Sequence, residues 1–85
     1  MYDLRVLEAA ENDLARLDRT TARRIVTRIQ WLAEHLDDIN PELLTGTLSG
    51  FFKLRAGDYR VIYKVFKTEN LIVIHHIGHR REVYR

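Results

Sequence analysis

The sequence contains no cysteine, only one proline, and no apolar stretch approaching the roughly 20 residues that cross a bilayer. The absence of cysteine excludes disulfides, thiolate catalysis and cysteine-based zinc sites, and it is compatible with a cytosolic protein. The first residues do not contain a basic stretch followed by an apolar run, which a signal peptide would require. We therefore expect a cytoplasmic protein that does not enter a membrane.

Length and composition predict one small folded domain over residues 1–85. Hydrophobic residues make up 46% of the 85 residues and charged residues 31%, which is the balance of a folded domain with a single core. The sequence shows no internal repeat and no low-complexity segment. A disordered tail is therefore excluded.

The formal net charge of +2 hides an uneven distribution of charge. Residues 1–44 carry 6 Lys/Arg and 9 Asp/Glu, a net of −3, whereas residues 45–85 carry 8 Lys/Arg and 3 Asp/Glu, a net of +5. Eleven of the fourteen cations are arginines, whose guanidinium groups suit bidentate contact with phosphate. The second half therefore has the charge of a polyanion-binding surface.

The first half of the sequence predicts a strand and two helices. Residues 2–7 alternate between apolar and polar positions, which favours a strand, and residues 8–17 have helical spacing. Residues 21–36 form the clearest helix, because four apolar residues recur on one face: Ile25, Ile29, Leu32 and Leu36. The two helices, joined by a short link, predict a helical hairpin.

The second half predicts three consecutive strands at residues 50–55, 59–67 and 70–78. Side chains alternate between the two faces of a strand. In the middle strand one face carries Tyr59, Val61, Tyr63 and Val65, and the other carries Arg60, Ile62, Lys64 and Phe66. We expect the Val/Tyr face to pack on the helices. The fold class is then α+β: an N-terminal strand, a helical hairpin and a three-stranded antiparallel meander whose open face is basic.

The cations and tyrosines of this second half suit RNA cleavage without a metal. That reaction needs a base for the ribose 2′-hydroxyl, cations for the charge that develops on phosphorus, and an acid for the leaving oxygen. Lys53 and Arg60 lie on neighbouring strands, and Arg80 and Tyr84 follow the last strand. The alternative is a solvated face of scattered cations, which is what most exposed arginines form.

The histidines of the last strand raise the question of a metal site. His75 and His76 are adjacent on a predicted strand, so alternation sends them to opposite faces. His76 and His79 lack a nearby acidic ligand other than Glu82. We therefore expect no metal and no other cofactor, and we consider His79 as a group that exchanges protons near neutral pH.

Two motifs together resemble a known family. The run LSGFFKLRAGDYRVIY at residues 48–63, followed by GHRREVY at residues 78–84, is similar to the RelE/ParE superfamily of type II toxin–antitoxin toxins. The similarity extends to the length of the chain and the order of its elements, and it is strongest to the RelE branch. RelE-type toxins enter the ribosomal A site and cut mRNA there by attack of the 2′-hydroxyl.

The resemblance implies roles for individual residues. Lys53 matches a catalytic lysine that accepts a proton or clamps phosphate, and Arg60 matches an arginine that stabilises the transition state. Arg80 matches an arginine that assists the leaving group, and Tyr84 matches a tyrosine that stacks on a base. The predicted RNA-binding residues are Arg55, His79 and Arg81.

The resemblance also implies partners and leaves alternatives. We expect the ribosome, mRNA and a cognate antitoxin as partners, with a toxin–antitoxin hetero-oligomer. RelE toxins have a second lysine where this chain has Phe51, which makes His79 a substitute candidate for the base. The rival hypothesis is a ParE-like inhibitor of DNA gyrase without catalytic activity, and a third is a toxin that retains only its antitoxin partner.

Overall fold

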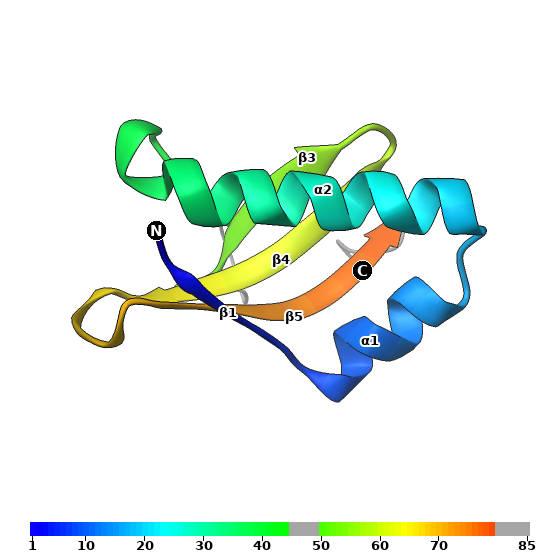
Figure 1. The fold of residues 1–85 in the computed structure, drawn as a ribbon, viewed down its shortest axis with the longest axis horizontal. Coiled ribbons are helices and arrows are strands. Elements are labelled where there is room, and N and C mark those ends of the chain that lie inside the picture. Colours follow the sequence, from blue (N-terminus) through cyan, green and yellow to red (C-terminus); the bar gives the residue numbers. More distant parts are fainter. Residues whose placement is uncertain (45–49, 80–85) are drawn as a thin grey trace.

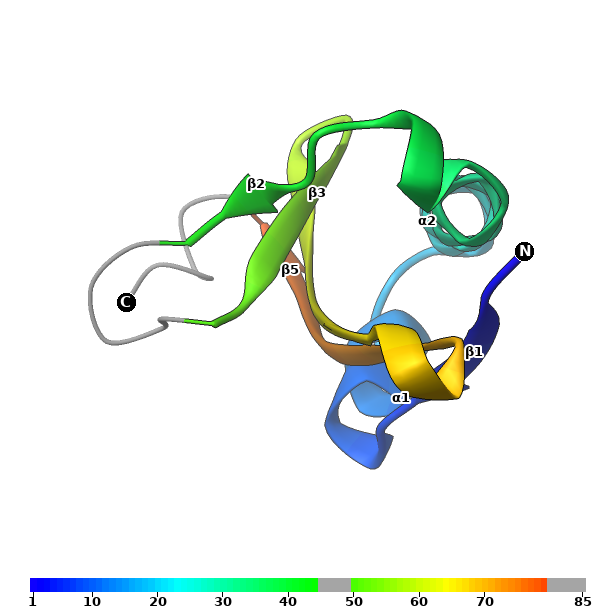
Figure 2. The ribbon, with the colours of Figure 1, turned by 90° about the vertical axis from the view of Figure 1, so that its left-hand side faces the viewer.

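The chain forms one mixed sheet with two helices against it (Figures 1 and 2). The computed structural model describes residues 1–44 and 50–79. In chain order its elements are β1 (Asp3–Val6), α1 (Glu8–Ala15), α2 (Arg19–His35), β2 (Glu42–Leu43), β3 (Phe52–Ala56), β4 (Tyr59–Phe66) and β5 (Leu71–His79). Short 3-10 turns at Leu36–Asp38 and Lys67–Glu69 follow α2 and β4.

The sheet has five strands in the order β1-β5-β4-β3-β2. The strands β3, β4 and β5 form the predicted antiparallel meander, and the α+β fold class is confirmed. β1 pairs with β5 in parallel, a partner that the sequence did not indicate. β2 was not predicted, because a strand of two residues has no readable alternation.

The helix α2 begins where its sequence provides a cap. The Asp18 carboxylate accepts a hydrogen bond from the Thr21 amide at 3.2 Å. Hydrogen bonding of the Thr21 side chain, and then of its amide, to this carboxylate lowers the pKa of Asp18. The helix therefore starts at Arg19, two residues before the predicted start. Its buried residues form the stripe that faces the sheet: Ile25, Ile29, Leu32 and Ala33.

The core lies between α2 and the sheet, on the face that alternation predicted. Val61 and Tyr63 of β4 are fully buried there, and burial raises the pKa of Tyr63 to about 12. Tyr59 and Val65 pack against the same core from its margin. Gly57, with φ of +63°, forms the tight turn between β3 and β4 that a residue with a Cβ atom would strain.

The two helices contact different parts of the sheet. α1 lies beside β5, where β1 has ended, and α2 crosses β3 and β4 (Figure 1). No helix in the part of the chain that the structure describes combines the length and apolar character needed to span a bilayer. β2 lies beside β3 as the edge strand of the sheet, and the face opposite the helices carries the side chains described next (Figure 2).

Candidate functional site

Three of the predicted cations lie on the sheet face that points away from the helices. Arg55 and Arg60 are directly opposite each other on β3 and β4, and Lys53 is opposite Ile62. Partners in an antiparallel pair project to the same side, so Lys53 and Arg60 are diagonal neighbours. The structure therefore brings Lys53, Arg55 and Arg60 together as the alternation of the sequence predicted.

A carboxylate that the sequence did not indicate joins this group. The strand β2 places Glu42 opposite Lys53, with the carboxylate oxygen 3.5 Å from the ammonium nitrogen. The Lys53 side chain is 24% exposed and that of Glu42 is 67% exposed. Such a pair contributes less than about 1 kcal/mol to stability. Its importance is chemical, since it puts a proton-accepting group beside the candidate lysine.

The two arginines differ in how they are held. Arg60 is half-buried, with one terminal nitrogen shielded from solvent. Arg55 is exposed, and its Nε donates a hydrogen bond to the Gly57 carbonyl at 3.1 Å. A guanidinium that is partly desolvated interacts more strongly with an anion than one that is fully hydrated. Arg60 is therefore the better placed of the two to stabilise developing negative charge.

The structure does not bring His79 to this group. His79 is paired with Tyr59, and the two rings lie 5.7 Å apart at 79°. Tyr59 packs on the helix side, and His79 lines a hollow there with Asp13 and Arg16 of α1. His79 thus lies across the sheet from Lys53. Its RNA-binding role stays a prediction, whereas a role as a base beside Lys53 does not fit this position.

Three of the predicted site residues lie beyond the end of β5, and Phe51 lies just before β3. Arg80, Arg81 and Tyr84 lie outside the described residues, so their positions relative to Lys53 and Arg60 stay predictions. β5 ends at His79, immediately before Arg80. Phe51, which stands at the family's second lysine position, has the Lys64 ammonium 4.6 Å from its ring centroid.

The histidines at the middle of β5 do not follow simple alternation. Ile62 is paired with His76 and Tyr63 with Ile74, so His75 is an extra, bulged residue. The prediction that His75 and His76 point to opposite faces is therefore wrong, because a bulge interrupts the period of two. Burial, the Lys64 charge and the neighbouring His76 lower the pKa of His75.

The bulged histidine also touches Phe51, at 4.8 Å between ring centroids. Within residues 1–44 and 50–79, no three His, Asp or Glu side chains gather as metal ligands would. The described part of the open face thus offers cations, a carboxylate and an imidazole.

Comparisons with known proteins identify the family of this chain. Residues 4–84 match the family described as ParE toxin of type II toxin-antitoxin system, parDE. Because the match covers nearly the whole chain, the protein belongs to this family within the RelE/ParE superfamily and is a toxin of the type II toxin–antitoxin class. No curated protein sequence matches the chain.

Solved structures with the same fold include both complexes and a free toxin. A chain of the RelBE2 toxin–antitoxin complex of Mycobacterium tuberculosis is 26% identical with a TM-score of 0.82, covering 93% of this chain and 98% of that one. A chain of the archaeal RelE–RelB complex of Pyrococcus horikoshii is 26% identical with a TM-score of 0.70, covering 95% and 97%. The isolated RelE toxin of E. coli shares the fold at 23% identity, with a TM-score of 0.74 and coverage of 99% and 92%.

Proposed function

We propose that this toxin is a ribosome-dependent endoribonuclease that cuts mRNA in the A site by attack of the ribose 2′-hydroxyl. The observation that carries the proposal is the convergence of Lys53 and Arg60 on one open sheet face, with the Glu42 carboxylate 3.5 Å from Lys53. The likeness to RelE structures supports it. DNA lacks the 2′-hydroxyl, so the reaction is specific for RNA.

The residues divide the chemical work as follows. Lys53, with Glu42 beside it, takes the proton of the 2′-hydroxyl or clamps the phosphate. Arg60 stabilises the negative charge on the pentacoordinate phosphorus, and Arg80 assists the leaving 5′-oxygen. Tyr84 stacks on a base next to the cut. The reaction needs neither a metal nor another cofactor.

The proposal includes a cognate antitoxin that binds and silences the toxin. The M. tuberculosis structure is a toxin–antitoxin complex, and the P. horikoshii structure is a RelE–RelB complex. Their likeness to this chain supports a hetero-oligomer of the same kind. An antitoxin that covers a cationic toxin surface should itself be acidic where it makes contact.

A second function is favoured by one specific observation. The family that matches residues 4–84 carries the description of ParE toxin, from the parDE system. The alternative is therefore a ParE-like protein that inhibits DNA gyrase without cutting anything. The two share a fold, so the fold does not distinguish them. The alternative predicts gyrase-linked DNA breaks with intact mRNA.

Primer extension on mRNA in a defined translation mixture tests the proposal. Wild-type protein should cut within codons only when ribosomes are present. Arg60→Ala should reduce cutting by at least about 100-fold, as the loss of one preorganised charge stabiliser does. Arg5→Ala, which removes an exposed arginine from β1 at the other end of the sheet, is the matched control and should cut normally.

Each outcome has a definite meaning provided that both variants melt as cooperatively as the wild type. Normal cutting by Arg60→Ala would show that Arg60 has been given the wrong role. Cutting without ribosomes would contradict the ribosome-dependent part. Intact mRNA together with gyrase-linked breaks would replace the proposal by the alternative.

A further inference from the structure

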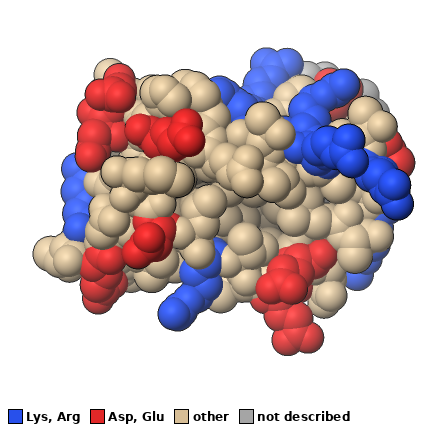
Figure 3. All heavy atoms as spheres, in the orientation of Figure 1, with Lys and Arg blue, Asp and Glu red and all other residues tan. Residues whose placement is uncertain are grey.

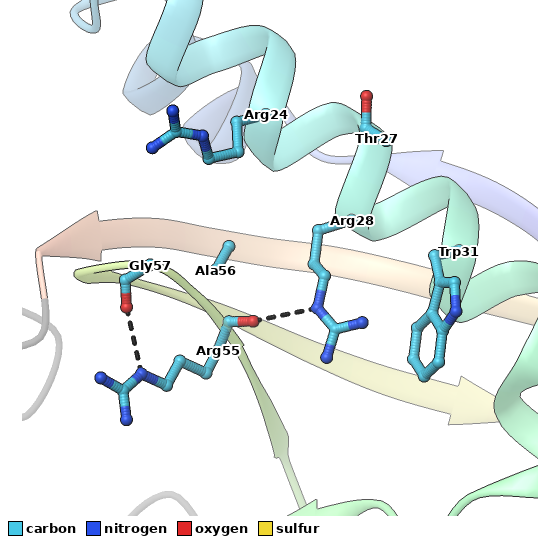
Figure 4. A pocket seen from close by; sticks show the side chains of 7 residues that line it. All are labelled: Arg24, Thr27, Arg28, Trp31, Arg55, Ala56 and Gly57. Atoms are coloured by element: carbon cyan, nitrogen blue, oxygen red, sulfur yellow. Dashed lines mark hydrogen bonds between the residues drawn. The ribbon is translucent and has the colours of Figure 1, made fainter.

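A groove lined by arginines runs between α2 and the outer edge of β3 (Figure 4). It encloses about 390 Å³ and is lined by Arg24, Arg28, Trp31 and Arg55 among others. Within residues 1–44 and 50–79, β2 pairs with Phe52 and Lys53, and no other described strand lies along the rest of the β3 edge, where the groove is found.

The groove combines charges from both halves of the sequence. Arg24 and Arg28 come from the half whose net charge is −3, and Arg55 from the half whose net charge is +5. In the space-filling view, Lys and Arg atoms gather over the N-terminal half of α2, whereas acidic atoms predominate toward its C-terminal end (Figure 3). The charge of each half therefore does not reveal this surface.

Two of the arginines are fixed in position. The Nε of Arg28 donates to the Arg55 carbonyl at 3.1 Å, and its guanidinium carbon lies 4.2 Å from the centroid of the Trp31 ring. The Nε of Arg55 donates to the Gly57 carbonyl at 3.1 Å. In both arginines Nε donates a hydrogen bond to a backbone carbonyl, and the two terminal nitrogens extend beyond that contact (Figure 4). These terminal forks match the oxygens of a phosphate group.

The acidic side chains that the structure describes do not pair with the arginines of this groove. Within the described part of the chain, none of Arg24, Arg28 and Arg55 forms an ion pair with a carboxylate. The Trp31 ring is already in contact with Arg28 and stacks on His35 at 4.8 Å. It therefore supports an arginine rather than offering a free platform for a base. The groove suits an anionic backbone more than an aromatic ligand.

The groove continues toward the proposed catalytic face. A second hollow of about 260 Å³ shares Arg28, Trp31 and Arg55 with it and extends to Glu42 and Lys53. One continuous polyanion can therefore pass Lys53, turn around the β3 edge at Arg55 and enter the groove. An added peptide strand fits less well, because the Arg55 carbonyl that it would pair with already accepts from Arg28.

We propose that this groove binds the sugar–phosphate backbone of the RNA that continues from the cut site. The inference rests on the proposed function for its substrate class and adds a second contact region outside the catalytic face. Arg24 and Arg55 contact phosphates directly. Arg28, held by Trp31 and by the β3 edge, forms the floor between them. Contacts of this kind bind RNA without reading its sequence.

Fluorescence anisotropy with a labelled single-stranded RNA tests this groove. Every ribose of the probe is 2′-O-methylated, so it binds but cannot be cut. The double variant Arg24→Gln/Arg55→Gln should weaken binding by about tenfold or more. The logarithmic salt dependence should lose about 1.4 from its slope, since each phosphate contact on single strands contributes about 0.7. The control Arg5→Gln/Arg23→Gln removes the same charge from exposed positions outside the groove.

The control should bind within about twofold of the wild type, because neither Arg5 nor Arg23 lines the groove and no phosphate contact is removed. Equal affinities for the two double variants, or no binding by the wild type, would overturn the groove proposal. So would binding of polyglutamate that needs Arg24 and Arg55 when RNA binding does not, which would assign the groove to an acidic peptide.

The failure of this inference can be told apart from failure of the proposed function. A toxin that cuts mRNA through Arg60 while the groove variants bind RNA normally refutes only the groove. A toxin that binds RNA through the groove but never cuts mRNA refutes only the endoribonuclease.

Discussion

The end of β5 is held by a side chain from α1, which gives a prediction about stability. β1 pairs with β5 only as far as Ile74, and beyond it the edge of β5 faces α1. There the Asp13 carboxylate accepts a hydrogen bond from the Ile77 amide at 2.9 Å, and the same oxygen lies 3.6 Å from His76 Nδ1. Asp13→Ala would leave that amide without its partner.

The size of the loss in the free energy of unfolding follows from the position of Asp13. A hydrogen bond to a charged group contributes about 1.5–3 kcal/mol, and Asp13, whose side chain is only 21% exposed, lies in the upper half of this range, at about 2.5 kcal/mol. Alanine favours the helix by about 0.5 kcal/mol over aspartate, and it removes an anion from the last turn. The net loss should be about 1.5 kcal/mol. For a domain of this size that lowers the Tm by roughly 6–12 °C.

Thermal unfolding followed by circular dichroism measures this effect. Asp13→Asn keeps an acceptor oxygen and should lose about half as much as Asp13→Ala. Asn12→Ala, at the exposed neighbouring position of α1, should change the Tm by less than about 2 °C. If Asp13→Ala and Asn12→Ala have the same Tm, the carboxylate does not secure the end of β5 and the reasoning is refuted.

Two further predictions concern β5 itself. Ile74→Ala should lower the free energy of unfolding in urea by about 2–5 kcal/mol, because Ile74 is fully buried. The control Val26→Ala, on the exposed side of α2, should lower it by less than about 1 kcal/mol. Similar losses in the two variants would contradict the assigned core. The lowered pKa of His75, due to burial, Lys64 and His76, means that the unfolded chain binds the proton more readily. Stability from this site is therefore present above about pH 6.5 and lost as the pH falls through the lowered pKa. The drop in Tm between about pH 7.5 and about pH 5 should be smaller in His75→Gln; an equal drop in both proteins would contradict this.

Regular periodicity made most of the fold predictable from sequence. The stripe of α2 and the alternation along β4 correctly assigned the core face, and with it the shared face of Lys53 and Arg60. A bulge in β5 shifts that alternation by one residue, so the predicted orientation of His75 relative to His76 was wrong. The position of His79 on the helix side of the sheet was not predicted, because it depends on the same bulge.

Features that depend on long-range pairing left no local pattern. The strand β2 is too short to show a period, so the approach of Glu42 to Lys53 was not predicted. The arginine groove joins residues 27 positions apart in sequence through the Arg28–Arg55 contact. The spacing of Arg24, Arg28 and Trp31 on one side of α2 was the only available signal, and it became meaningful once the β3 edge was placed beside it.

The position of β5 in the sheet has a consequence for synthesis of the toxin. β5 lies between β1 and β4, so the first strand of the chain has no partner until residues 71–79 have been made. Contacts between segments so distant in sequence form late, because a long loop must close first. A nascent chain that ends before β5 lacks a large part of the core, so the sheet that carries Lys53 and Arg60 is incomplete. The order of the strands thus delays completion of the sheet until residues 71–79 are available to pair, an interval during which an antitoxin can already be present.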